Sequence, residues 1–138
     1  MKQETIEKLN KILKDNVKWP LVIEGVTASN FPKAIVIPAI ISPSELGIIP
    51  SDTGLKYPSW VMQLMISAKK STRNILVIDG LDRIIENEQN KFWGMLSSKG
   101  INGYKFPNET QIIIPISNGS KDKISQRILS LALYFKVE

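Results

Sequence analysis

The stretch Ile75-Leu76-Val77-Ile78-Asp79 decides the fold class of this chain. Four apolar residues in succession end in a single acid, a pattern typical of a parallel strand that is buried on both faces. Such a strand carries its last side chain to the rim of the sheet, where nucleotide-binding enzymes hold Mg²⁺. The stretch therefore predicts a buried parallel strand that delivers Asp79 to the sheet rim.

Length and composition limit what this chain can do. Its 138 residues predict a single domain, 1–138, in which 43% of the residues are hydrophobic and 22% are charged. Cysteine and histidine do not occur, so disulfides, thiolate metal sites and the usual general base are excluded. Any acid–base chemistry would have to use Asp, Glu, Lys or Tyr.

The chain is basic, with a net charge of +5 and a pI of about 9.5. The excess is dispersed over single and paired lysines, which favours a solubility role and leaves nucleic-acid binding as an alternative. The apolar stretch 34–41 is interrupted by Pro38 and is too short to span a bilayer, and the N-terminus lacks the apolar core of a signal peptide. We therefore expect a cytoplasmic protein that does not enter a membrane.

Hydrophobic periodicity predicts strands that alternate with helices, which indicates an α/β fold with a mainly parallel five-stranded sheet and flanking helices. Pro38 cannot donate to a strand ladder, so its strand belongs at a sheet edge. The predicted strands are 21–26, 34–41, 74–79, 111–116 and 133–137. The predicted helices are 2–15, 59–70, 81–88 with 90–96, and 124–132; 100–106 is a small hairpin, and 42–58 is a long loop with a turn of helix through 42–46.

From Ser42 onward, the order of these pieces resembles the AAA+ ATPase fold, in particular its MoxR-like branch. The segment 75–84, ILVIDGLDRI, resembles Walker B, and 100–116, GINGYKFPNETQIIIPI, resembles the hairpin and the sensor-1 strand. Asn118 falls where sensor 1 sits, and 131–137 resembles the segment that carries the arginine finger. The resemblance implies a reduced AAA+ core, like that of P-loop NTPases, with strand order 5-1-4-3-2 and no C-terminal lid before the chain stops at Glu138.

The phosphate-binding loop departs from the family pattern. A P-loop needs G-x-x-x-x-G-K-[ST], whose backbone N–H groups and lysine hold the phosphates. The corresponding segment 25–34 reads GVTASNFPKA, with Pro32 in place of a glycine and Ala34 in place of the hydroxyl residue. Lys33 is wrongly spaced, and we interpret it as a surface charge. The helix that should follow the loop is also missing, so part of one face of the predicted sheet lacks its usual cover.

The other catalytic parts are also replaced. Gly80 stands where the family has its catalytic glutamate, and Tyr134 stands where the arginine finger is expected. Losing one such group can cost about 10²–10⁵ in rate, so we expect no ATP hydrolysis, no bound cofactor and no metal. Asp79, Asn118 and Lys33 are the candidates for a vestigial nucleotide site. Asn118 is equally well explained as an Asn-Gly turn residue. Asp82 is better explained as a helix N-cap or first-turn acid.

These observations favour a non-catalytic binding or scaffold protein that assembles with itself or with an active AAA+ ATPase. The uncovered sheet face is the expected interface, because large apolar patches usually mark interfaces. The alternative is that the N-terminal helix, through Ile6, Leu9 and Leu13, folds back over that face.

A different function is an accessory protein that binds nucleic acid. Lys99, Tyr104 and Lys105 belong to the hairpin that some AAA+ relatives direct toward DNA, and an aromatic ring between lysines can stack on a base. The alternative is that Tyr104 and Phe106 pack beneath the hairpin. An atypical NTPase is the remaining possibility.

Overall fold

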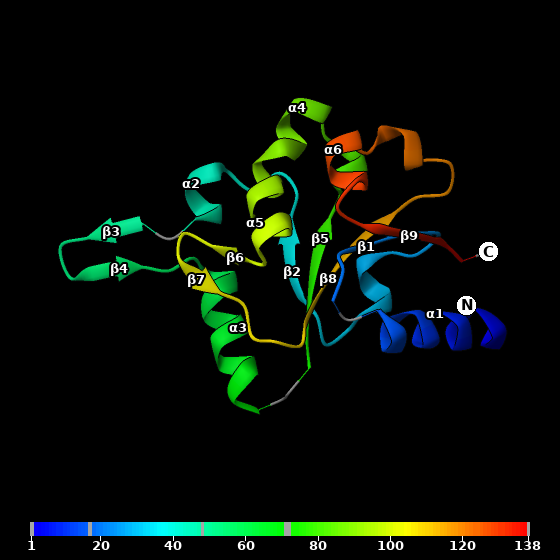
Figure 1. The fold of residues 1–138 in the computed structure, drawn as a ribbon, viewed down its shortest axis with the longest axis horizontal. Helices are drawn as coiled ribbons and strands as arrows, with labels where there is room; N and C mark the ends of the chain where they lie inside the picture. Colours follow the sequence, from blue (N-terminus) through cyan, green and yellow to red (C-terminus); the bar gives the residue numbers. More distant parts are fainter. Residues whose placement is uncertain (1, 17, 48, 71–72, 138) are drawn as a thin grey trace.

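The computed structural model describes residues 2–16, 18–47, 49–70 and 73–137, and its centre is a five-stranded sheet. All neighbouring strands of this sheet run parallel, in the order β2-β5-β8-β1-β9 (Figure 1). Counted along the chain, this is the expected order 5-1-4-3-2. The strands are β1 (Leu21–Glu24), β2 (Ile35–Pro38), β5 (Asn74–Asp79), β8 (Thr110–Ile116) and β9 (Leu133–Lys136).

Helices and two hairpins surround the sheet (Figure 1). The α-helices are α1 (Gln3–Asp15), α2 (Pro43–Leu46), α3 (Ser59–Lys70), α4 (Glu86–Gln89), α5 (Trp93–Ser98) and α6 (Gln126–Leu129). Single 3₁₀ turns are η1 (Ala28–Asn30), η2 (Leu81–Arg83), η3 (Asn90–Phe92) and η4 (Lys121–Lys123). The hairpins are β3 (Ile49–Ser51) with β4 (Gly54–Lys56), and β6 (Gly100–Ile101) with β7 (Tyr104–Lys105).

The predictions for α3 and β5 match their observed bounds, and the small hairpin and the helical turn after Ser42 are also confirmed. The prediction that the rest of 42–58 is an irregular loop is wrong, since it contains the β3–β4 hairpin. The helix predicted over 81–88 is broken, because Ile84 and Ile85 are both extended. The buried Gln89 amide holds this break in place by donating to the carbonyl oxygens of Ile84 and Lys123.

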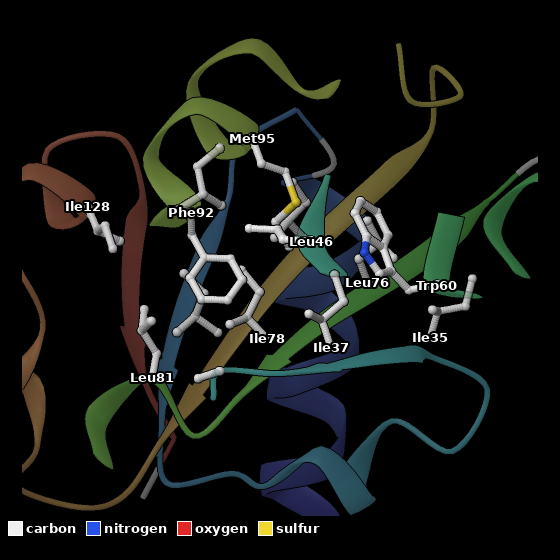
Figure 2. Packing of buried hydrophobic residues seen from close by; sticks show 14 of the residues in the cluster. Ile35, Ile37, Leu46, Trp60, Leu76, Ile78, Leu81, Phe92, Met95 and Ile128 are labelled. Atoms are coloured by element: carbon white, nitrogen blue, oxygen red, sulfur yellow. The ribbon is translucent and has the colours of Figure 1, made fainter. Parts of the chain in front are cut away.

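The larger core lies on the face of the sheet covered by α3, α5 and α6. Figure 2 shows Phe92 beside Ile78 and Met95 beside Leu46, with Trp60 on the far side of Leu46. Side chains from helices close over one side of the parallel strands, which is the usual way in which such a sheet buries its faces.

The other face is covered by α1, so the expectation of an uncovered face is wrong; its alternative is right for Leu9 and Leu13, whereas Ile6 is 36% exposed. Leu9 and Ile12 are buried against Ile23 and Ile113 of the sheet. The end of α1 is fixed there because Gln111 Nε2 donates to the Leu13 and Asn16 carbonyl oxygens at 2.9 and 3.2 Å. The helix turns its apolar stripe to the sheet.

Strand β2 occupies a sheet edge, as Pro38 predicts. It is shorter than the predicted 34–41, because the Ile41 N–H turns back to the Pro38 carbonyl oxygen at 3.0 Å. Among the described residues, no helix combines the length and the apolar character that a bilayer crossing requires.

Candidate functional site

The candidate site is a crevice at the carboxyl ends of β1, β5 and β8, where ligands bind in open α/β sheets. Its volume is about 310 Å³. The residues that follow β1, including Thr27 and Ser29, form one wall, and Asp79, Asp82 and Arg83 form another. Ser117, just after β8, completes it.

Asp79 reaches the sheet rim as predicted, but it is held loosely. Its carboxylate lies 3.4 Å from the Arg83 guanidinium, and the two side chains are 40% and 71% exposed. Exposed pairs of this kind contribute about 0–1 kcal/mol to stability. Asp79 is therefore accessible from the crevice and has one weak partner.

Gly80 has a structural reason to be glycine. Its φ of +89° lies in the left-handed region, which a residue with a side chain enters at a cost. A Cβ atom built on Gly80 would lie 2.8 Å from Arg83 Nη2. A glutamate at this position would strain the backbone and displace the arginine, so this turn does not present a general base.

Asp82 lies in the first turn of η2, where the sequence placed it, and it makes one further contact. Its Oδ2 accepts from the Ser117 N–H at 3.0 Å, which ties the end of β5 to the turn after β8. Asp82 therefore acts as a structural clamp across the crevice.

The segment after β1 forms a local turn. The Thr27 N–H donates to Asn30 Oδ1 at 2.8 Å, and the Asn30 N–H donates back to the Thr27 carbonyl oxygen. The Thr27 and Ser29 hydroxyls lie 2.7 Å apart. Lys33 is exposed beyond this turn and does not line the crevice. The geometry therefore does not bring Lys33 together with Asp79.

A second acid, Glu24, ends β1 and was missed by the sequence analysis. It is 3% exposed and lies on the α6 side of the sheet, as its neighbour Val22 does. The Tyr134 hydroxyl donates to Glu24 Oε1 at 2.7 Å, and the Gly119 N–H donates to Oε2 at 3.2 Å. Lys136 Nζ lies 3.4 Å from Oε2.

These contacts shift two titrations in opposite directions. The hydroxyl of Tyr134, the Gly119 N–H and the charge of Lys136 lower the pKa of Glu24, against the opposing effect of burial. The same hydrogen bond to Glu24 raises the pKa of Tyr134. Lys121 adds a cation over the Tyr134 ring at 4.1 Å. Tyr134, in the position expected for an arginine finger, thus bonds within its own chain.

A signal for Glu24 was present in the sequence. Val22-Ile23-Glu24-Gly25 repeats the pattern of Val77-Ile78-Asp79-Gly80, an apolar run followed by an acid and a glycine. Gly25 also has a positive φ, of +96°, and a Cβ there would lie 2.3 Å from the Val137 carbonyl oxygen. Both acids end parallel strands, yet they point to opposite faces of the sheet.

Asn118 lies in an exposed turn, followed by Gly119 with φ +80° and closed by the Ser120 N–H to the Ser117 carbonyl oxygen. A Cβ built on Gly25 would lie 3.3 Å from Asn118 Oδ1, so Asn118 sits beside the end of β1. The turn geometry is enough to explain Asn118, and its assignment to a vestigial nucleotide site stays a prediction.

The hairpin residues predicted to contact nucleic acid are placed unequally. Tyr104 is half-buried and its ring meets that of buried Phe106 edge-on at 6.1 Å, as the packing alternative predicted. Lys105 is exposed. Burial, and then the positive charge of Lys18, lower the pKa of Lys99. The charge of Lys18 therefore acts on half-buried Lys99, whereas Tyr104 shows only part of its ring.

The described residues contain no group of three or more carboxylates that would bind a metal ion. Asp79 and Asp82, the acids of the crevice, are bonded to Arg83 and to the Ser117 N–H. In comparisons with known proteins, no family model and no curated sequence matches this chain.

Proposed function

We propose that this chain is a non-catalytic binding or scaffold protein on a degenerate AAA+-like core, and that it assembles with itself or with an active AAA+ ATPase. The all-parallel sheet and its strand order support the core assignment. The lining of the strand-end crevice is the observation that carries the non-catalytic part.

A bound nucleoside triphosphate needs cations and free N–H donors at the strand ends. Among the described residues that line the crevice, Arg83 is the lone cation and it faces Asp79, while Asp82 adds a second negative charge. The lining is thus net negative, and a triphosphate would be repelled by it. This charge balance favours a structural role for the crevice.

Thermal unfolding with and without Mg·ATP tests the proposal. A ligand that binds the native state raises the midpoint, by about 2.7 kcal/mol of stabilisation at a hundredfold excess over Kd. We expect no shift at millimolar ATP and no release of phosphate. A shift that disappears in Asp79→Asn would establish nucleotide binding in the crevice, and phosphate release together with it would establish the atypical NTPase.

Assembly is tested separately, because it does not depend on nucleotide. Light scattering on the purified chain should give a mass above that of one 15.5 kDa chain, or a mass that rises on mixing with an AAA+ ATPase. A monomer that remains a monomer in both experiments would remove the assembly part and leave the non-catalytic part standing.

Nucleic-acid binding is a second candidate function, and the proximity of Lys18 and Lys99 favours it. Trp19, next to Lys18, is 57% exposed and offers a ring for stacking. Fluorescence anisotropy with labelled single-stranded DNA should then show binding that weakens with salt and is lost in Lys18→Ala with Lys105→Ala. Unchanged anisotropy at low salt would remove this candidate.

A further inference from the structure

A cleft of about 540 Å³, larger than the strand-end crevice, runs beside the edge strand β2. Val36, Ile37 and Pro38 form its inner wall, and Tyr57 and Trp60, near the start of α3, face them. The volume and the apolar and aromatic lining are those of a binding site. We call it the β2 cleft.

The edge of β2 leaves one residue without backbone partners. The Ala39 N–H donates to the Asp79 carbonyl oxygen at 2.8 Å, so residues 35, 37 and 39 face β5. Val36 therefore turns its N–H and C=O outward, along the β2 cleft. In the described part of the chain, neither group has a hydrogen-bond partner.

Pro38 limits what this edge can accept. It has no N–H, and its carbonyl oxygen already accepts from Ile41. The outward edge thus offers the donor and acceptor of Val36 alone, which suits one crossing segment. If the β2 strands of two copies paired with each other, Pro38 would leave their ladder without the N–H donor that follows that of Val36. This argues against a second copy of this chain as the occupant.

Trp60 supplies a second unmet hydrogen-bonding group. Its side chain lines the β2 cleft and the residue is 4% exposed. The indole N–H is buried and has no acceptor in the described part of the chain. Because solvent does not reach this N–H, the indole offers an occupant of the cleft its ring, and its signal reports on that occupant.

Exposed apolar residues also lie close in sequence to the residues that line the β2 cleft. Ile40 is 81% exposed, Leu55 on β4 is 58% exposed and Ile66 on α3 is 54% exposed. Ile40 precedes the lining residue Ile41, Leu55 precedes Lys56, and Ile66 lies about one helical turn after Gln63. Figure 1 shows the β3–β4 hairpin reaching away from the body. Exposed apolar surface around a cleft marks contact with another polypeptide.

We propose that the β2 cleft binds an extended apolar segment of a partner polypeptide. The segment pairs with the N–H and C=O of Val36 and places an apolar side chain in the cleft, against the Trp60 ring. Strand addition of this kind takes affinity from main-chain hydrogen bonds and specificity from a side-chain pocket. The inference rests on the proposed binding function, for which it names the surface and the class of partner.

Phage-displayed linear twelve-residue peptides, selected on the whole immobilised chain, provide the probe. The most enriched peptide is titrated into ¹⁵N-labelled protein while the three tryptophan indole N–H resonances are followed. We expect the Trp60 signal to move and saturate while the signals of Trp19 and Trp93 stay in place. The Val36 amide should gain protection from hydrogen exchange.

Val36→Pro removes the outward N–H and leaves the bonds to β5 intact, so peptide affinity should fall about tenfold or more. Val36→Thr keeps the N–H and the branched shape and should bind within about threefold of the original chain. Ile85→Ser, which removes an exposed apolar residue from the α4 region, should leave affinity unchanged. Thermal unfolding of each variant confirms folding.

The proposal is overturned if no peptide is enriched, if enriched peptides bind Val36→Pro as tightly, or if Trp60 does not respond. A dimer that Val36→Pro converts to monomer would replace the partner segment with a second copy. A Mg·ATP titration of the same labelled sample keeps the two proposals apart. Movement of the Gly80 amide with nucleotide contradicts the inference that the crevice does not hold a triphosphate, whereas failure of peptide binding alone contradicts only the inference about the β2 cleft.

Discussion

The ends of β1 and β5 carry the same pattern, an acid followed by a glycine with positive φ, in two different environments. Glu24 is buried and accepts hydrogen bonds from Tyr134 and the Gly119 N–H. Asp79 is 40% exposed and has one weak contact with Arg83. The comparison teaches that the acid with the strongest sequence signal is the one least built into the structure.

The face of the sheet explains the difference. Glu24 shares its face with Val22, below α6, where β9 brings Lys136 into register beside it. Asp79 shares its face with Val77, on the side of α1 and the turn after β1. The first acid is enclosed by a neighbouring strand and a turn, and the second opens into the crevice.

Substitution of the two glycines should give the largest contrast. Gly25→Ala places a Cβ 2.3 Å from a backbone oxygen that cannot move freely, so we expect a loss of about 3 kcal/mol or more in unfolding free energy. Gly80→Ala meets the flexible tip of Arg83 and should cost about 1–2 kcal/mol, from φ strain alone. Urea unfolding measures both. Equal losses in unfolding free energy would contradict the expectation that the Arg83 side chain moves aside more easily than the Val137 carbonyl oxygen.

Neutralising the acids should give the next largest contrast. Glu24→Gln removes the charge that Lys136 and the Tyr134 hydroxyl stabilise, and its melting temperature should fall clearly. Asp79→Asn removes an exposed pair and should change unfolding free energy by about 0–1 kcal/mol. Thermal unfolding at neutral pH compares them. A larger loss at Asp79 would reverse the assignment of the structural acid.

The pH dependence of stability sharpens the comparison at Glu24. Its pKa is lowered in the folded chain, so its contribution is fully present above the unfolded pKa, near 4.5, and is lost as pH falls through the folded value. The stability difference between the original chain and Glu24→Gln should therefore shrink as the solution is acidified below about pH 4.5. A difference that stays constant down to pH 2 would contradict a charged Glu24.

Tyr134→Phe should have the smallest effect of the series. It removes the hydroxyl that most lowers the pKa of Glu24 while keeping the ring under Lys121. The Glu24 titration, followed by NMR of its side-chain carboxyl carbon, should move up toward the ordinary glutamate value. An unchanged titration would mean that Gly119 and Lys136 alone hold the charge.

Local sequence patterns predicted those strands and helices whose structure depends mainly on residues adjacent in the chain. The run 75–78 predicts β5 and the periodicity of 59–70 predicts α3. Burial of a strand or of one helix face produces a hydrophobic pattern that can be recognised within a short stretch of sequence. The edge position of β2 followed from Pro38, a property of a single residue. The strand order followed from the resemblance and not from the patterns.

Contacts between distant residues were not predictable in the same way. The Glu24–Tyr134 hydrogen bond joins residues 110 positions apart, and it depends on the register between β1 and β9. The cover provided by α1 depends on where Leu9 and Ile12 land on the sheet, so it stood as one of two alternatives. The β3–β4 hairpin lacks the strict alternation of a half-buried strand, because its described residues on β4 are all exposed.

We infer that the crevice at Asp79 does not hold a triphosphate. The most direct test is a titration of ¹⁵N-labelled chain with Mg·ATP, in which the amides of Gly80, Thr27 and Ser117 report on the crevice walls. We expect these signals not to move at millimolar nucleotide. Saturable movement of all three, abolished in Asp79→Asn, would contradict it.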